Sequence, residues 1–150
     1  MIEFEPGGIY PLIKVTTPPD INFFTEHKKA INKYGLVWFC RFGKSNMKVA
    51  SLESCCKVLI IKESKKNGDG VYIAPYDIVH EGNEPPYGVY PTYYDEIIHP
   101  KSLWIRLTDI EKISKTALES TFVVNTSGNK VSGILKSMCP AVFIRYEGKE

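Results

Sequence analysis

Several features that would identify a common class of protein are missing from this sequence. None of the four cysteines, Cys40, Cys55, Cys56 and Cys139, forms a Cys-x-x-Cys pair, so we expect reduced thiols, no disulfide and no structural metal. No apolar run approaches the roughly 20 residues that span a bilayer, and residues 1–5 lack the basic and apolar regions of a signal peptide. The sequence therefore predicts a cytoplasmic protein without a membrane partner.

Catalytic fingerprints are equally scarce. The sequence has no Gly-x-Ser-x-Gly elbow, no Walker-type phosphate loop and no glycine pattern for a dinucleotide. Its histidines, His27, His80 and His99, lie too far apart to predict a metal site, and His27 is expected to be a packed or hydrogen-bonded residue of a helix. We predict no cofactor and assign no catalytic residue.

Lysine and arginine are absent from residues 71–100, which carry five acidic residues. Residues 1–70 hold eleven basic and seven acidic residues, and residues 101–150 hold eight and five, so the net charge of +2 comes from the two ends of the chain. A phosphate is expected to meet the first or last third and to be repelled by the middle. The alternative is that the charges only solvate the surface.

Periodicity predicts one α+β domain over residues 1–150, a mixed, largely antiparallel β-barrel with two or three short flanking helices. Pro11 places the first strand at an edge, Asp20 is the expected N-cap of the first helix, and Gly35 closes that helix. Pro75 marks a bulge or the end of pairing. The expected strands cover residues 9–15, 36–42, 47–50, 56–62, 71–79, 102–110, 121–125 and 141–146, and the expected helices cover 21–33, 113–118 and 131–138. Residues 35–125 are expected to form most of the barrel. The residues expected to be buried are Leu36, Phe39, Val58, Ile60, Ile73, Ile105 and Val123.

The stretch from residue 35 to residue 46 is an apolar strand that runs directly into a small basic loop. Alternation places Trp38 and Phe39 on opposite faces, and Arg41 is the one charged residue in the strand. The loop residues Lys44, Ser45 and Asn46 offer donors to an anion or to the edge of a base. This stretch is our first candidate for a binding site.

Six of the nine tyrosines lie within residues 71–100, most of them in a segment with four prolines and no regular pattern. Tyr93 and Tyr94 can supply flat stacking faces over a pocket, or they can pack the segment onto the barrel. Trp104, in a later strand beside Arg106, is a further residue that could line a site. Composition does not decide between stacking and packing.

Residues 35–146 resemble the PUA-like superfamily, and within it the EVE branch. The similar features are the aromatic strand that ends in Arg41-Phe42-Gly43-Lys44, the hairpin that carries Val58-Leu59-Ile60-Ile61 and Val71-Tyr72-Ile73-Ala74, and the late strand Leu103-Trp104-Ile105-Arg106-Leu107. Many relatives have Gly-Asp before the second hairpin strand, where this chain has Ser54-Cys55-Cys56. The resemblance implies a mixed barrel whose pocket takes a nucleobase, often a modified one, in RNA or DNA, without catalysis.

The first interpretation is therefore a nucleic-acid-binding module in which aromatic rings stack on a base and the basic loop holds the neighbouring phosphate and reads the base edge. The residues assigned to this site are Trp38, Arg41, Lys44, Ser45, Asn46, Tyr93, Tyr94 and Trp104. Two alternatives stay open. One is a small-barrel enzyme acting on a nucleotide or RNA-derived substrate, with Asp95 and His99 as the acid–base pair. The other is a protein-interaction adapter that uses the tyrosine-rich segment.

Overall fold

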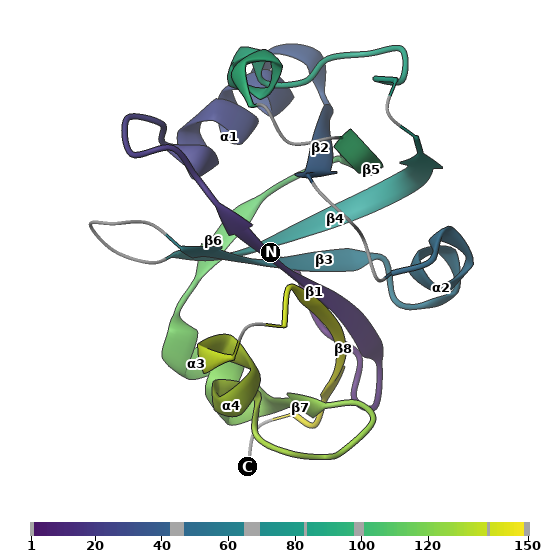
Figure 1. Ribbon diagram of the computed structural model, residues 1–150. Coiled ribbons are helices and arrows are strands. Elements are labelled where there is room, and N and C mark those ends of the chain that lie inside the picture. The colour runs from purple at the N-terminus through teal and green to yellow at the C-terminus, as the bar shows by residue number, and fades with distance from the viewer. Residues whose placement is uncertain are drawn as a thin grey trace.

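The computed structural model describes residues 2–42, 47–64, 70–82, 84–97, 101–137 and 139–148, which form one eight-stranded sheet with four short α-helices (Figure 1). The helices are α1 (Phe23–Tyr34), α2 (Val49–Ser54), α3 (Lys115–Thr121) and α4 (Val131–Lys136), with a 3-10 helix η1 (Thr92–Glu96). The strands are β1 (Ile9–Thr16), β2 (Val37–Phe42), β3 (Val58–Ser64), β4 (Gly70–Glu81), β5 (Lys101–Leu107), β6 (Glu111–Ile113), β7 (Phe122–Val124) and β8 (Ala141–Tyr146). The fold is thus α+β, as the periodicity predicts.

The strands follow the order β2-β5-β4-β3-β1-β8-β7, and β6 pairs with β4 beside this path. All neighbours are antiparallel except β1 and β3, which are parallel. Among the described strands no ladder joins β2 to β7, so the hydrogen-bonded sheet is open and the predicted closed barrel is unconfirmed. In Figure 1, α1 lies at the β2 end of this sheet, and α3 and α4 lie beside β7.

Successive residues of the central strands point into two different cores. Leu59 and Ile61 of β3 belong to a large core that also includes α1 and α2, whereas Ile60 belongs to a second core beneath α3 and α4. This alternation buries both faces of β3, which explains its continuous apolar run. Of the residues predicted to be buried, Phe39, Ile60, Ile73 and Ile105 are buried, while Leu36, Val58 and Val123 are half-buried.

The long strand β4 changes partner at Pro75. Up to this residue β4 pairs with β3, and from Tyr76 onward it pairs with β5, with a register shift between Tyr76 and Ile78. Proline cannot donate to a ladder, and the bulge beside it bends the strand. The predicted bulge is therefore confirmed, and it lets one strand serve both halves of the sheet.

The first helix begins two residues later than predicted. The side chain of Asn22, not Asp20, caps it by accepting a hydrogen bond of 2.9 Å from the Thr25 amide. Gly35 ends the helix with a φ of 85°, and its amide donates to Ile31. Since only glycine adopts this left-handed backbone without strain, the predicted C-cap is confirmed.

Two further predictions are wrong. Residues 47–50 do not form a strand, because Val49–Ser54 is the helix α2, whose Leu52 is fully buried. β1 is not an edge strand, because it lies between β3 and β8 near the middle of the sheet, outside the 35–125 range expected to hold most of the barrel. Pro11 is tolerated there since the ladder with β3 begins only at Leu12.

The segment from residue 84 to residue 97 covers the outer edge of β2. Val89 accepts a hydrogen bond of 2.8 Å from the Trp38 amide, and the Tyr94 hydroxyl accepts one of 3.3 Å from the Cys40 amide. Exposed strand edges promote aggregation, and here the covering segment occupies two of the edge donors. Among the described helices, none is long and apolar enough to cross a membrane.

Candidate functional site

The aromatic residues assigned to stacking form a third hydrophobic cluster between β2, β5 and the covering segment. Trp38 is 4% exposed, Tyr94 1% and Trp104 0%. The Trp38 indole donates to the Tyr87 carbonyl at 3.2 Å, and the Arg106 guanidinium lies over its ring at 5.9 Å. Side chains this deeply covered offer no ring face to an external base, so their arrangement corresponds to the packing alternative for the tyrosine segment.

Tyr94 is held in this cluster by a buried hydrogen-bond relay. His27 is fully buried, and its Nδ1 donates to the Phe23 carbonyl at 2.8 Å, because a carbonyl can only accept. Its Nε2 then accepts from the Tyr94 hydroxyl at 2.6 Å. Burial lowers the pKa of His27 to about 4 and raises the pKa of Tyr94 well above its usual value, so both side chains are neutral at physiological pH. The prediction of a hydrogen-bonded His27 is confirmed.

The other predicted site residues fall into two groups. Arg41 is half-buried at the end of β2 and donates to the Phe42 carbonyl at 2.6 Å, and Tyr93 is half-buried beside Tyr94. Burial lowers the pKa of Arg41 and raises that of Tyr93. Three predicted residues, Lys44, Ser45 and Asn46, lie outside the described residues. The structure thus places Arg41, Tyr93 and Tyr94 at the same end of the sheet.

The proposed acid–base pair cannot be compared in full, because His99 lies outside the described residues. Asp95 is exposed and accepts a hydrogen bond of 2.7 Å from the Tyr90 hydroxyl. This bond raises the pKa of Tyr90. Asp95 therefore has a structural partner in the covering segment.

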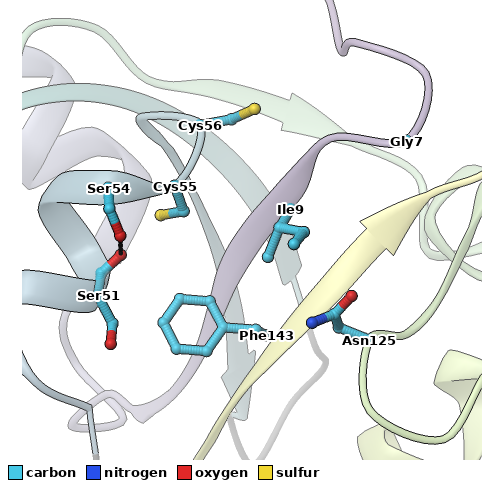
Figure 2. A pocket seen from close by; sticks show the side chains of 8 residues that line it. All are labelled: Gly7, Ile9, Ser51, Ser54, Cys55, Cys56, Asn125 and Phe143. Atoms are coloured by element: carbon cyan, nitrogen blue, oxygen red, sulfur yellow. Dashed lines mark hydrogen bonds between the residues drawn. The ribbon is translucent and has the colours of Figure 1, made fainter.

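A different hollow, with a volume of about 350 Å³, lies between α2, the start of β1 and the strand β8 (Figure 2). This volume falls in the range of roughly 300–1,000 Å³ that is typical of small-molecule sites. We call it the α2–β8 pocket. Its described lining consists of Gly7, Ile9, Ser51, Ser54, Cys55, Cys56, Asn125 and Phe143.

One side of the α2–β8 pocket is apolar and the other offers hydrogen-bonding groups. Phe143 and Ile9 extend from neighbouring strands, and the half-buried ring of Phe143 lies in the middle of the hollow in Figure 2. Facing them, Ser51 and Ser54 come from the same side of α2, where the Ser54 hydroxyl donates to the Ser51 carbonyl at 3.2 Å. A flat apolar group beside hydroxyls is suited to a planar ligand with polar edges.

Asn125 supplies a fixed amide at the rim. Arg145 donates to its backbone carbonyl at 3.2 Å and to its side-chain Oδ1 at 3.3 Å, which sets the orientation of the amide. Arg145 is itself held by Glu147 at 2.7 Å. With Oδ1 turned to Arg145, the Nδ2 of Asn125 points toward Phe143 in Figure 2. The pocket therefore has an oriented donor opposite the two serines.

The adjacent cysteines point in different directions. Cys55 faces the pocket and lies 3.3 Å from the Tyr76 hydroxyl, whereas Cys56 turns away and packs in the second core. Burial raises the pKa of Cys55, so its thiol stays protonated and is a poor nucleophile. A Cβ atom at Gly8 would lie 2.9 Å from the Cys56 sulfur and 2.9 Å from the Glu5 carbonyl oxygen. The absence of a side chain at this glycine therefore lets the backbone pass close to Cys56.

The described lining of the α2–β8 pocket contains no charged side chain and no acid–base pair. A charge-free cavity with one ring face and oriented donors binds a neutral group better than an anion, because nothing in it compensates a buried charge. Across the described residues, no group of three or more His, Cys, Asp or Glu side chains is placed to hold a metal ion.

Sequence analysis did not identify the α2–β8 pocket. Its residues lie in four segments, and only the pairing of β1 with β3 and β8 brings Ser54 and Phe143 to one place. The one local signal was the departure at Ser54-Cys55-Cys56 from the pattern of the resembled family, which falls on the wall of the pocket.

Comparison of the chain with protein-family models, with curated proteins and with solved structures finds no match.

Proposed function

We propose that this chain is a non-catalytic nucleic-acid-binding module that recognises a nucleobase, including a modified one, in RNA or DNA. Two things support the proposal: the resemblance of residues 35–146 to the PUA-like superfamily and its EVE branch, and the α2–β8 pocket. The PUA-like barrel is part of the proposal. The strand β4, which bends at Pro75 and pairs on both sides, supplies the curvature that such a barrel needs.

The single observation that carries the proposal is the neutral lining of the α2–β8 pocket. A base is an uncharged heterocycle with a flat face and a polar edge, and Phe143 offers the matching ring while Ser51, Ser54 and Asn125 offer hydrogen bonds. Stacking on an aromatic side chain contributes on the order of 1–3 kcal/mol per base. The stacking role predicted for Trp38, Tyr94 and Trp104 therefore passes to Phe143 in this proposal.

Phosphate contacts must come from outside the pocket. Arg145 lies behind Asn125, and Lys57 directly follows Cys56 and is exposed. These cations flank the lining without entering it. Such an arrangement suits a nucleic-acid strand whose phosphate backbone stays in solvent while one base enters the pocket. Within the proposal, Arg41 and Lys44 supply further phosphate contacts, as predicted from the sequence.

Binding of uncharged nucleosides tests the pocket apart from any phosphate contact. A panel of ribo- and deoxyribonucleosides is titrated into the protein and followed by NMR chemical shifts or calorimetry. We expect at least one nucleoside to bind, and Phe143→Leu, which keeps an apolar side chain but removes the ring, to weaken that binding roughly tenfold.

Ser54→Ala has a closely matched control. Ser120 of α3 is also an exposed helix serine whose hydroxyl donates three residues back, to the Ala117 carbonyl, at the same 3.2 Å. We expect Ser54→Ala to weaken nucleoside binding about 2- to 12-fold, as loss of one hydrogen bond does, and Ser120→Ala to leave it unchanged. The proposal fails if no nucleoside binds, or if both pocket variants bind like the unaltered protein.

A further inference from the structure

The outer face of α1 carries a second hollow, of about 480 Å³, which differs from the α2–β8 pocket in charge. While α1 buries Phe23, His27 and Ile31 against the sheet, its outer residues form two adjacent rows at four-residue spacing. The rows are Phe24-Lys28-Asn32 and Thr25-Lys29-Lys33, and these six residues line the hollow. We call this surface the α1 groove.

The floor of the α1 groove is an aromatic side chain covered by a cation from another element. Phe24 is half-buried and stacks on Tyr72 of β4 with ring centroids 5.7 Å apart. The Lys112 ammonium, from β6, lies 4.9 Å from the centre of the Phe24 ring. Residues far apart in sequence therefore extend the basic surface from α1 to the neighbouring strand.

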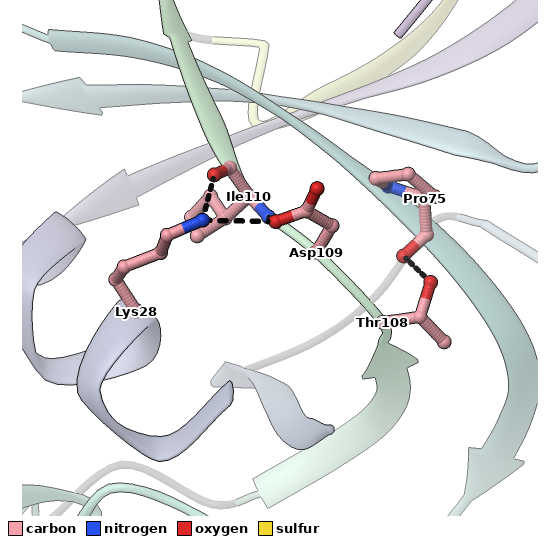
Figure 3. A network of polar contacts seen from close by, with 5 residues as sticks. All are labelled: Lys28, Pro75, Thr108, Asp109 and Ile110. Atoms are coloured by element: carbon pink, nitrogen blue, oxygen red, sulfur yellow. Dashed lines mark hydrogen bonds and ion pairs between the residues drawn. The ribbon is translucent and has the colours of Figure 1, made fainter. Parts of the chain in front are cut away.

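The cations of the α1 groove are only partly compensated. Lys28 is held 3.0 Å from Asp109, and it also donates to the Ile110 carbonyl at 3.5 Å (Figure 3). Nearby, Thr108, which directly follows β5, donates to the Pro75 carbonyl of β4. Lys29 lies 3.6 Å from Glu26 in a pair that leaves 69% of the lysine side chain exposed.

The remaining two cations have no acidic partner. Among the described residues, neither Lys33 nor Lys112 forms an ion pair, and both are exposed. Lys33 lies over the ring of Tyr34, which is itself 53% exposed. Unpaired cations next to accessible aromatic rings make up the combination by which proteins follow a single-stranded nucleic-acid backbone.

From this arrangement we infer that the α1 groove binds the phosphodiester backbone of a single-stranded nucleic acid, with Lys29, Lys33 and Lys112 as phosphate contacts and Tyr34 as a stacking face. The inference rests on the proposed function for the nature of the partner. It adds a binding surface separate from the α2–β8 pocket, and charge complementarity selects the occupant. A neutral pocket for a base and a cationic groove for the backbone divide the recognition of one polymer between two surfaces.

The salt dependence of oligonucleotide binding tests the groove. The probe is a fluorescein-labelled oligo-uridine or oligo-thymidine of roughly 12 nucleotides, within the usual site sizes for single strands, followed by anisotropy between about 50 and 200 mM salt. Each lost contact to a single strand lowers the slope of log K against log salt by about 0.7. Lys33→Ala/Lys112→Ala should therefore lower the slope by about 1.4 and weaken binding roughly 25-fold at about 0.1 M salt.

The matched control is Lys130→Ala/Lys136→Ala, which removes two exposed lysines at the α4 end of the sheet. We expect this pair to change the slope by less than half as much. Lys33→Arg/Lys112→Arg keeps both charges and should retain the original slope, which separates phosphate contact from any effect on helix stability. The inference is overturned if the groove pair behaves like the control pair, or if the oligonucleotides do not bind at all.

The outcomes separate this inference from the proposed function. Nucleoside binding that survives Lys33→Ala/Lys112→Ala, together with a lysine-dependent salt slope, supports both. Lysine-dependent oligonucleotide binding without nucleoside binding supports the groove and removes the pocket. Nucleoside binding, together with a salt slope that the groove substitutions leave unchanged, supports the pocket and removes the groove. Tighter groove-dependent binding of a poly-glutamate peptide than of either oligonucleotide shows that the occupant is an acidic protein and overturns the inference.

Discussion

Replacing Tyr94 by phenylalanine removes the centre of the buried relay and is the sharpest test of how the covering segment is held. The Tyr94 hydroxyl donates to His27 Nε2 at 2.6 Å and accepts from the Cys40 amide at 3.3 Å. Without it, a ring nitrogen and a strand amide that are both buried lose their partners. The apolar contacts of the ring with Trp104 and Phe42 are retained.

The expected loss of stability follows from these two groups. A buried polar group left without a partner costs about 1–3 kcal/mol, and the longer bond to Cys40 belongs at the lower end, so Tyr94→Phe should lose roughly 2–4 kcal/mol. That is a large part of the roughly 5–15 kcal/mol by which domains are usually stable. With a urea dependence of about 2 kcal/mol per M, the middle of the usual range, the unfolding midpoint should fall by roughly 1–2 M.

Urea unfolding followed by tryptophan fluorescence and by circular dichroism measures this shift. Tyr90→Phe is the matched control, because it removes a hydroxyl of the same segment whose bond to Asp95 is exposed. Loss of an exposed bond should change stability by no more than about 0.5 kcal/mol. Equal effects of the two substitutions would refute the relay as a source of stability.

The remaining predictions concern His27 and Gly8. Since burial lowers the pKa of His27 from its usual 6.5 to about 4, its contribution to stability is complete above pH 6.5 and is lost as pH falls toward 4, by up to about 1.4 kcal/mol per pH unit. His27→Gln should remove this dependence from urea unfolding curves measured between these pH values, and an unchanged slope would show that His27 does not titrate there. Gly8→Ala brings a Cβ to 2.9 Å from the Cys56 sulfur and should cost about 1–3 kcal/mol in the same assay. Gly133→Ala in α4, where nothing lies within 4 Å, should be neutral or stabilising, and a comparable loss there would contradict the steric account.

The parts of the fold that depend on local patterns were predictable. Alternation along β2 placed Trp38 and Phe39 on opposite faces, and the structure puts them in different cores. The left-handed cap at Gly35 and the bulge after Pro75 follow from the backbone properties of glycine and proline, which act within a few residues.

The errors arose where distant residues decide the outcome. Pro11 predicts an edge strand, but the ladder with β3 starts one residue later, so an interior position leaves no donor missing. Residues 49–54 form a helix because Leu52 fills the large core, which no local pattern reveals. β3 also extends past Lys62 to Ser64, where the buried Glu63 accepts a hydrogen bond of 2.7 Å from Tyr72.

The candidate site was less predictable than the fold, because its chemistry depends on which side of a ring faces solvent. Tyr93 and Tyr94 have the composition of a stacking surface, yet the contact of Tyr94 with His27, 67 residues away, turns its ring inward. No sequence pattern distinguishes Phe143 from the other apolar residues of its strand, although the pocket beside α2 leaves its ring accessible.

In the folded chain, two acidic residues from the middle of the sequence form hydrogen bonds within the sheet and the covering segment. Asp77 accepts two hydrogen bonds from Arg106, which lower its pKa, and Asp95 is bonded to Tyr90, so these carboxylates organise the half of the sheet that carries the covering segment. The unpaired lysines, Lys33 and Lys112, come instead from α1 and β6. Because a polyanion is attracted to cations that have no acidic partner, a nucleic acid bound as we infer would meet these lysines at the α1 groove. The charge pattern along the chain agrees with this inference, whereas Tyr94 of the same middle segment serves packing.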